Sequence, residues 1–192
     1  INAIQNQLKQ LSNIRSDISS LSISTKNAIT YYTSFNGKIL DIIPIAAKLS
    51  SNDKLAKNLM AYANFLYAKE RAGIERAVLS AVFGAKGFGK GLFQKTVTLI
   101  AQQNAFIKAF LVIANEETNA HYTKMMKNEA VAQVQTLRNR ALNKDFSVNA
   151  EHWFKTITNK INILKNIDDF IAENAIKDIK SLKSYAESDM FL

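Results

Sequence analysis

Apolar side chains recur along most of the chain at intervals of three and four residues, which is the spacing of an amphipathic α-helix. Polar and glycine-rich segments interrupt this pattern at a few places. It predicts six helices, over residues 2–22, 25–49, 53–83, 92–115, 129–142 and 150–187. The segment 116–127 is more polar, so we expect a bend there, and residues 143–149 are expected to form a loop.

The last predicted helix is long for a chain of 192 residues. At 1.5 Å per residue, residues 150–187 would span about 60 Å. Its apolar positions keep a near-heptad spacing, so it needs neighbouring helices along most of its length. The sequence therefore predicts an all-α fold, an elongated antiparallel helical bundle, formed by a single domain over residues 1–192.

Residues that interrupt helices are few and clustered. Proline occurs once, at Pro44, where it would kink the second helix or mark its last turns. Four of the six glycines lie between Gly84 and Gly91. Their spacing up to Gly89-Lys90 matches the first part of a phosphate-binding loop, but Gly91 stands where Ser or Thr would bind magnesium. Because the segment also follows a helix rather than a strand, we interpret it as a helix-to-helix connection.

Composition narrows the chemistry. The chain has no cysteine and two histidines, so it offers no disulfide and too few ligands for a metal cluster, and we expect no metal and no other cofactor. The net charge of +9 favours an anionic partner. The cations are scattered, however, and nothing resembles a basic recognition helix, so nucleic acid is not expected as a partner. Five arginines are present: Arg15, Arg71, Arg76, Arg138 and Arg140.

The densest charged segment within a helical pattern is residues 69–79. One helical stripe there is apolar above and below and carries two cations, Lys69 and Arg76, with no acid. On the neighbouring stripe, Arg71 and Glu75 are four residues apart and can pair with each other. An unpaired cation on a core-facing stripe is costly to bury. Either another helix supplies a carboxylate to this stripe, or a bound anion does.

Gly73 lies in the middle of the same helix, where glycine costs roughly 1 kcal/mol relative to alanine. We expect it to mark the close approach of another helix, or of a ligand beside Arg76. A kink in the helix is the alternative explanation.

An enzymatic function is not expected. Glu70 and Glu75 lie about 140° apart around their helix, so they do not converge as an acid–base pair. Neither His121 nor His152 stands in a recognisable arrangement with a nucleophile and an acid. We therefore expect no catalytic residue.

The order of residues in the charged segment carries a resemblance. The run from Lys69 to Ala77, Lys-Glu-Arg-Ala-Gly-Ile-Glu-Arg-Ala, resembles the signature of the nitrate- and nitrite-sensing (NIT) domain family. Other features agree with it: Arg15 in the first helix, Tyr31-Tyr32 followed by Asn36, Gln102-Gln103 after the glycine segment, and Arg138. The stretch from Phe146 to Lys165, with Trp153-Phe154 and Lys160-Ile161-Asn162, is similar to the segment that comes after this domain in bacterial chemoreceptors. The resemblance covers nearly the whole chain.

The resemblance implies an all-helical sensor built from two stacked four-helix bundles that share long helices. It also implies an anion site lined by arginines from several helices. We expect Arg76 to bind nitrate, nitrite or a similar small anion, with Arg15 and Arg138 as its partners and with Lys69 and Gly73 beside it. Guanidinium suits this role because it is planar, permanently charged and presents its donors in a fork.

The family occurs in chemoreceptors, sensor kinases and transcription antiterminators. On this resemblance we expect a periplasmic sensor domain of an inner-membrane methyl-accepting chemotaxis receptor, with a membrane-proximal and a membrane-distal half. A homodimer is expected in the intact receptor, which would signal by displacement of the helix over residues 150–187. No apolar run approaches the roughly 20 residues of a spanning helix, so the adjoining transmembrane helices would lie outside this chain, which begins at Ile1.

The main alternative is a structural or protein-interaction helical module without a small-molecule ligand. That alternative predicts that Arg15, Arg76 and Arg138 all find carboxylates within the fold.

Overall fold

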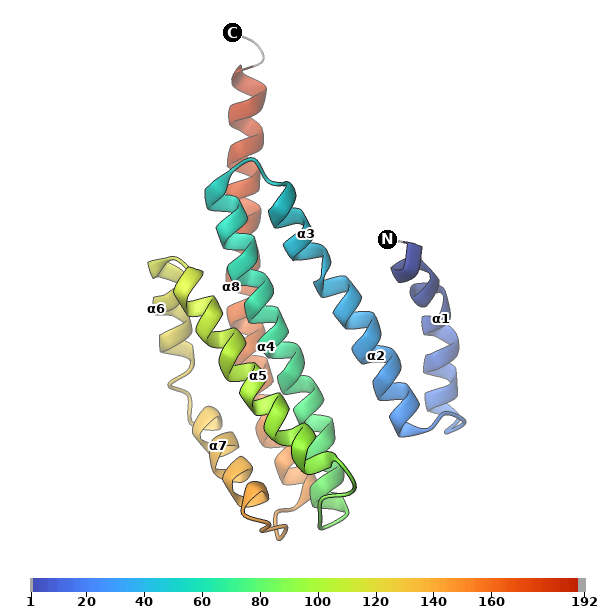
Figure 1. The fold of residues 1–192 in the computed structure, drawn as a ribbon. Coiled ribbons are helices and arrows are strands. Elements are labelled where there is room, and N and C mark those ends of the chain that lie inside the picture. Colours follow the sequence, from blue (N-terminus) through green and yellow to red (C-terminus); the bar gives the residue numbers. More distant parts are fainter. Residues whose placement is uncertain (1, 190–192) are drawn as a thin grey trace.

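The computed structural model describes residues 2–189, and about 85 % of the chain is helical. No strand occurs in these residues, so the predicted all-α fold is confirmed. Figure 1 shows the helices in order. They are α1 (Asn2–Ser19), α2 (Thr25–Leu40), α3 (Ile42–Leu49), α4 (Asp53–Gly84), α5 (Leu92–Ile113), α6 (Glu116–Met125), α7 (Glu129–Leu142) and α8 (Ala150–Asp189).

The predicted helix over residues 25–49 is divided into α2 and α3 at Asp41. The Asp41 N–H donates to the Gly37 carbonyl, and Ile42 begins the next helix. Pro44 occupies the first turn of α3, where its missing N–H leaves no helical hydrogen bond unmade. The proline therefore marks a helix start, and the break lies one turn before it.

The polar segment after α5 forms a helix of its own, α6, where we expected a bend. Asn115 caps it, with the side-chain oxygen accepting from the Thr118 N–H at 2.8 Å. Asn128 caps α7 in the same way, accepting from the Ala130 N–H at 3.0 Å. An asparagine at an N-cap satisfies a donor that the helix leaves free, so two caps close together divide this part of the chain into two helices.

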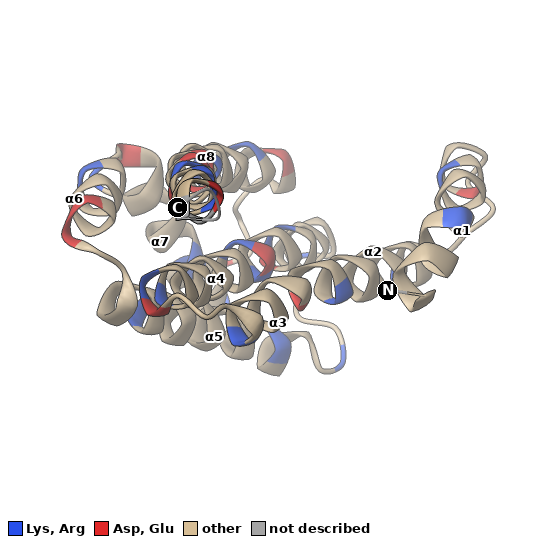
Figure 2. Ribbon diagram, turned by 90° about the horizontal axis from the view of Figure 1, so that it is seen from above, with Lys and Arg blue, Asp and Glu red and all other residues tan. Residues whose placement is uncertain are grey.

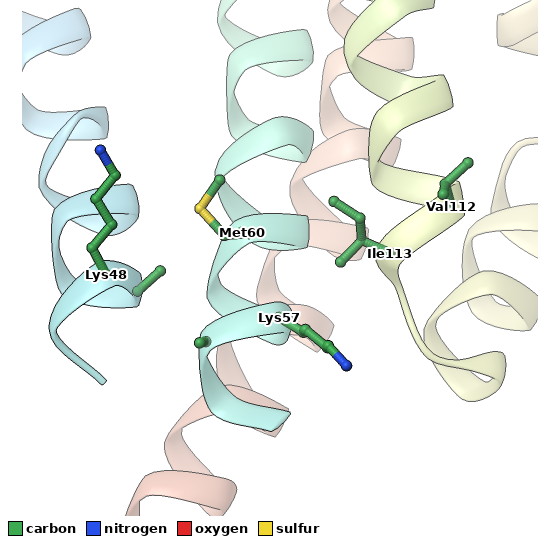
Figure 3. Close-up of a pocket in the computed structure, with 7 residues that line it drawn as sticks. Lys48, Lys57, Met60, Val112 and Ile113 are labelled. Atoms are coloured by element: carbon green, nitrogen blue, oxygen red, sulfur yellow. The ribbon is translucent and has the colours of Figure 1, made fainter. Parts of the chain in front are cut away.

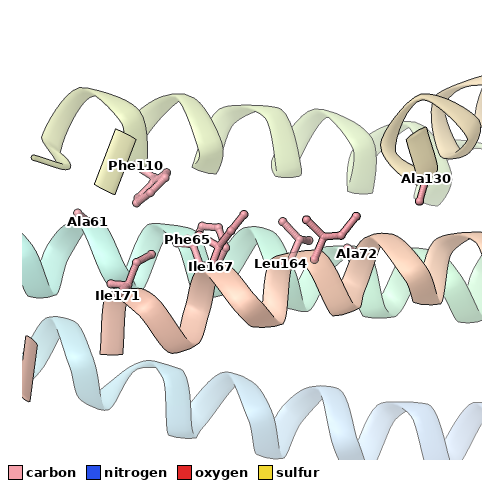
Figure 4. Close-up of a cluster of buried hydrophobic side chains, with 9 residues drawn as sticks. Ala61, Phe65, Ala72, Phe110, Ala130, Leu164, Ile167 and Ile171 are labelled. Carbon is pink, nitrogen blue, oxygen red and sulfur yellow. The ribbon is translucent and has the colours of Figure 1, made fainter. Parts of the chain in front are cut away.

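The centre of the molecule is a bundle in which α4, α5 and α8 lie against one another and α6 and α7 complete the remaining side (Figure 1). Figure 4 shows one of its two buried apolar clusters, with side chains of α4, α5 and α8 pointing toward one another. The cluster contains Ala61, Phe65, Ala72, Phe110, Ala130, Ile163, Leu164, Ile167 and Ile171, with Tyr122 and Met125 of α6 packed against it.

The second cluster lies further along the same long helices. It contains Leu79, Val82 and Phe83 of α4, residues of α7, and Trp153 and Ile157 of α8. Burying each large apolar side chain contributes about 1.5–3 kcal/mol. The bundle therefore has two stacked halves that share α4 and α8. Helix α6 and the start of α7 cover the first half, and the rest of α7 covers the second.

The first three helices lie outside this bundle. Helices α2 and α3 pack on α4, while α1 packs against α2 and stands apart from the bundle in both views (Figures 1 and 2). No residue of α1 is buried. The Tyr31 hydroxyl donates to the Gln7 carbonyl and joins α2 to α1. The N-terminal helices thus form one wall of a groove beside α4.

The expectation that no segment approaches a spanning helix is wrong by length and composition alone, because helix α5 is long and apolar enough to cross a membrane. Core helices of soluble proteins meet the same criterion, and α5 packs along α4. Figure 2 shows Lys and Arg spread over the helices of the molecule, without one continuous basic face in this view.

Candidate functional site

Of the five predicted site residues, Arg76 comes closest to the predicted arrangement, which is an inward-facing cation without an acidic partner. It is half-buried on α4, and its Nη1 donates to the Thr158 hydroxyl at 3.0 Å. Its guanidinium lies 4.8 Å from the centre of the Phe154 ring. Among residues 2–189, no carboxylate lies within ion-pair distance of it. Arg76 is therefore a cation held against α8 by neutral groups.

The backbone of Arg76 is tied to α8 as well. The indole Nε1 of Trp153 donates to the Arg76 carbonyl at 3.1 Å, and the Trp153 side chain is fully buried. The carbonyl of Arg76 also accepts from the Ser80 hydroxyl at 2.7 Å. Any movement of α8 relative to α4 in this region must change contacts of Arg76.

Lys69 does have an acidic partner, which the sequence pattern did not reveal. Its ammonium forms an ion pair with Asp168 of α8, and Asp168 also accepts from the Tyr62 hydroxyl at 2.7 Å. The acid missing from the α4 stripe is thus supplied across the bundle, as one of the two expected explanations required. Lys69 acts as a link between α4 and α8.

No other helix approaches Gly73 closely, so that part of the prediction is wrong, whereas the close approach of a ligand stays a prediction. A β-carbon added to Gly73 would meet no atom within 4 Å, and α4 runs through this position as one helix. Gly73 and Arg76 border a groove of about 410 Å³ between α4 and the first two helices. Gly73 therefore leaves open space one turn from the guanidinium of Arg76.

An acid lies in the same groove. Glu70 accepts from the Asn36 side chain at 3.2 and 3.3 Å, and burial raises the pKa of its carboxyl group. Burial disfavours the charged form, whereas the Asn36 hydrogen bonds and the charges of Arg71 and Lys69 favour it. Glu70 moderates the positive potential of the groove without pairing with Arg76.

Arg15 is exposed on α1, and no hydrogen bond or ion pair of its side chain is found among the described residues. Ile18, three residues later and so on the same side of α1, borders the groove. Arg15 thus lies one helical turn from the groove that contains Arg76, on a helix that packs only lightly.

Arg138 faces a different part of the molecule. It is buried on α7, where Nε and Nη2 each donate to one oxygen of Glu75 at 2.6 Å. Nη2 also donates to Gln103 of α5 at 2.8 Å, and the Gln103 amide donates to Glu75 at 2.8 Å. These three residues form a closed network that joins α4, α5 and α7 inside the bundle. In this conformation Arg138 is a structural partner, as the alternative interpretation requires.

The expected pairing of Arg71 with Glu75 is wrong. Glu75 is fully buried and faces Arg138, whereas Arg71 lies over the rings of Tyr67 and Phe106 at 5.6 and 5.1 Å. A bidentate guanidinium inside the bundle stabilises the buried carboxylate far better than a solvated partner one turn away.

The structure therefore does not bring the five predicted site residues together: Arg76 and Gly73 share a groove, Arg15 lies near it, and Lys69 and Arg138 have acids of their own.

Lys160 was not predicted. It is buried on α8 at 7 % exposure, next to the Glu75–Arg138 pair. Burial lowers its pKa to about 8, and the charge of Arg138 adds to this effect, while Glu75 opposes it. The signal was present in the sequence, because Lys160 follows Trp153 and Ile157 at helical spacing on the inward stripe of α8.

An apolar groove of about 570 Å³ lies elsewhere, where α3, α4 and the end of α5 meet. Figure 3 shows Met60 and Ile113 in its wall, with Lys48 and Lys57 at the sides. Its lining residues include none of the arginines. The wall of this groove therefore offers an anion no guanidinium fork.

Comparison with known proteins decides the family. The family model described as nitrate and nitrite sensing matches residues 1–176. The chain belongs to the nitrate and nitrite sensing family. A curated relative, the nitrate regulatory protein of Klebsiella oxytoca, is 24 % identical over 173 residues, which cover 85 % of this chain and 42 % of the relative.

A solved structure of the NasR transcription antiterminator has the same fold, with a TM-score of 0.88 at 22 % identity over 95 % of this chain and 50 % of that one. This NIT domain thus spans half or less of the length of the relatives that it matches.

The expected periplasmic location is wrong. The relatives are a nitrate regulatory protein and a transcription antiterminator, and antitermination takes place where RNA is made, inside the cell. Chemotaxis, a membrane receptor and adjoining transmembrane helices find no support in these relatives either. The motif identified the family correctly, but it carries no information on the output module to which a NIT domain is attached.

Proposed function

We propose that this NIT domain senses nitrate or nitrite by binding the anion in the groove beside Arg76. The observation that carries the proposal is that Arg76 has no acidic partner in the described residues and borders open space at Gly73. A half-buried guanidinium without a counter-charge is stabilised when an anion arrives.

The donors available suit a small planar anion. The guanidinium of Arg76 has five N–H donors, and one described hydrogen bond, to Thr158, uses only one of them. Nitrate and nitrite each carry a single negative charge spread over their oxygens, so a guanidinium fork can meet two oxygens at once. Arg15 supplies a second guanidinium when α1 turns or slides toward α4. Binding in this proposal involves no catalysis.

Signalling follows from the links between Arg76 and α8. An anion that draws the guanidinium into the groove competes with the Thr158 hydroxyl and the Phe154 ring. The anion thus makes different contacts in two arrangements of α4 and α8, which is the requirement for a ligand to shift a conformational equilibrium. Movement of α8, a helix of 40 residues, would carry the signal toward the C-terminal end of the domain. The expected homodimer of the intact protein stays a prediction.

The proposal is tested by melting the domain in the presence of nitrate, nitrite, sulfate and small carboxylates at matched ionic strength. Nitrate or nitrite should raise the melting temperature more than the other anions, and the effect should saturate. A ligand at 100 times its Kd adds about 2.7 kcal/mol to the free energy of unfolding. Arg76→Ala should remove the response, while Arg71→Ala, which removes another α4 arginine without an acid, should keep it. An equal response in both variants would reject Arg76 as the site.

A further inference from the structure

Lys160 is a buried cation without an acid of its own. It is one of the few charged residues at 7 % exposure or less, and among residues 2–189 no hydrogen bond or ion pair of its ammonium group is found. Its neighbours Arg138 and Glu75 already pair with each other at 2.6 Å. The three side chains together therefore carry one uncompensated positive charge inside the bundle.

This excess charge is present near neutral pH. The pKa of Lys160 is lowered from 10.5 to about 8, mainly by burial. At pH 7 the ammonium form is still the major one. A protonated lysine inside a protein without a partner is unfavourable. The buried ammonium group therefore either destabilises the fold or has a counter-ion bound beside it.

A small cavity lies at the same place. It has a volume of about 80 Å³ and is lined by residues of α4, α5, α6 and α8, including Lys160, Gln103 and Tyr122. Asn104, which is exposed, stands at its edge and gives it contact with solvent. A site for one water molecule needs only about 10–15 Å³ by this measure, so the cavity has room for an ion of a few atoms.

We propose that this cavity, which we call the Lys160 cavity, is a second binding site that holds one small monovalent inorganic anion. The charge of such an ion equals the excess charge of the Lys160–Arg138–Glu75 group. A doubly charged anion such as sulfate would leave one negative charge uncompensated in the bundle and would lose more hydration on entry. The amide of Gln103 is already bonded to Glu75 and Arg138, so the lining residues with donors left for the ion are Lys160, Tyr122 and Asn104.

The Lys160 cavity is independent of the groove beside Arg76. It lies inside the bundle among α4, α5, α6 and α8, whereas Arg76 borders the groove between α4 and the first two helices. An anion in the cavity would join α5, α6 and α8 and hold together the half of the bundle that α6 covers. This site therefore supports the folded state irrespective of what binds at Arg76.

The direct test is a crystal of the domain grown or soaked in sodium bromide. Bromide is monovalent, fits the cavity and is located by its anomalous scattering. We expect an anomalous peak in the Lys160 cavity in the wild-type domain, and in Arg76→Ala as well. Absence of a peak in the wild-type crystal would overturn the proposal.

Solution measurements use Lys160→Met, with Lys165→Met as the matched control on the same helix. Met replaces the buried cation with an apolar side chain of similar length, which buried sites often accept without loss of stability. Lys165 is exposed and pairs with Asp169. In the wild type and in Lys165→Met, each tenfold increase in chloride above its Kd should raise the melting temperature by about 3–5 °C relative to matched sulfate. Lys160→Met should lose this increase, and an unchanged increase would overturn the proposal.

The two proposals fail separately when the nitrate response is measured in the Lys160→Met background, where the second site cannot contribute. If Arg76→Ala keeps the full nitrate response while bromide occupies the Lys160 cavity, the groove is not the sensing site and the second site stands. If Arg76→Ala loses the nitrate response but no bromide is found, the reverse holds.

Discussion

Glu75 and Arg76 are neighbours in the sequence, yet their side chains contact different helices. Glu75 is fully buried and paired with Arg138 of α7, whereas Arg76 is half-buried and held by Thr158 and Phe154 of α8. Successive residues of a helix differ by about 100° in direction, so one step along α4 separates a closed ion pair from an open cation. Arg138, the partner of Glu75, is therefore a structural arginine, whereas Arg76 is the candidate ligand-binding one.

The structural role of Arg138 predicts a large loss of stability on truncation. Arg138→Ala leaves Glu75 buried without its partner, which should lower the free energy of unfolding by about 3–5 kcal/mol. Urea unfolding followed by circular dichroism measures this loss. Arg140→Ala on the same helix, which breaks an exposed pair with Asp145, should change stability far less. Similar small losses in both variants would show that the Glu75–Arg138 pair does not hold the bundle together.

The role of Gly73 beside the proposed anion site can be tested by the substitution Gly73→Ala, which fills the open space next to it. Because no atom lies within 4 Å of an added β-carbon, Gly73→Ala should raise the free energy of unfolding by about 0.5–1 kcal/mol. The same methyl group lies one turn from Arg76 in the groove, so it should weaken the stabilisation by nitrate. Gly37→Ala on α2 is equally uncrowded and should give a similar gain in stability with the nitrate response intact. If the two variants respond alike to nitrate, Gly73 does not border the ligand.

Glu70 should oppose anion binding in the groove. Removing its charge in Glu70→Gln is therefore expected to strengthen nitrate binding, because an acid no longer borders the site. Since burial raises the pKa of Glu70, lowering the pH through that pKa should strengthen nitrate binding to the wild type, and the variant should lack this change. Calorimetric titration at several pH values gives both results. Weaker binding in Glu70→Gln would place the anion elsewhere.

Helix positions could be predicted from the sequence, whereas the partners of the charged groups could not. Apolar periodicity gives α4, α5, α7 and α8 nearly at their observed bounds, because each helix must bury one face. Asp168 is 99 residues from Lys69, so no local pattern indicates their ion pair. For Glu75, sequence spacing favours Arg71, but a solvated pair four residues apart contributes only about 0.3–0.5 kcal/mol. Burial in the bundle selected Arg138 instead.

The location of the domain could not be predicted for a different reason. A ligand-binding motif records contacts within the domain, and those are the same whichever output module is attached. The buried position of Lys160, by contrast, could have been predicted from the sequence, because a cation on an otherwise apolar stripe indicates either a cross-bundle partner or a cavity.

The lowered pKa of Lys160 predicts how stability depends on pH. Between about pH 8 and its ordinary pKa of 10.5, Lys160 binds a proton in the unfolded chain but not in the folded one. The free energy of unfolding should therefore rise with pH over this range. The charged or titratable groups around Lys160 are Glu75 of α4, Arg138 of α7 and Tyr122 of α6, and burial raises the pKa of Tyr122 above 10.0.

Urea unfolding from about pH 8 to about pH 9.5 in chloride-free buffer measures this rise before the tyrosines titrate. The wild-type curve should rise relative to that of Lys160→Met, and Lys165→Met should follow the wild type. Parallel curves for the wild type and Lys160→Met would mean that Lys160 keeps an ordinary pKa in the fold.

Trp153 is the one tryptophan of the chain, and it makes the central claim directly measurable. It is fully buried and donates to the Arg76 carbonyl, so its emission reports the contact between α4 and α8 at the proposed site. Titration with nitrate should give a saturable change in Trp153 emission in the wild type and in Arg71→Ala. In Arg76→Ala only the linear quenching by nitrate in solution should remain. A saturable change of the same size and midpoint in Arg76→Ala would contradict binding of nitrate at Arg76.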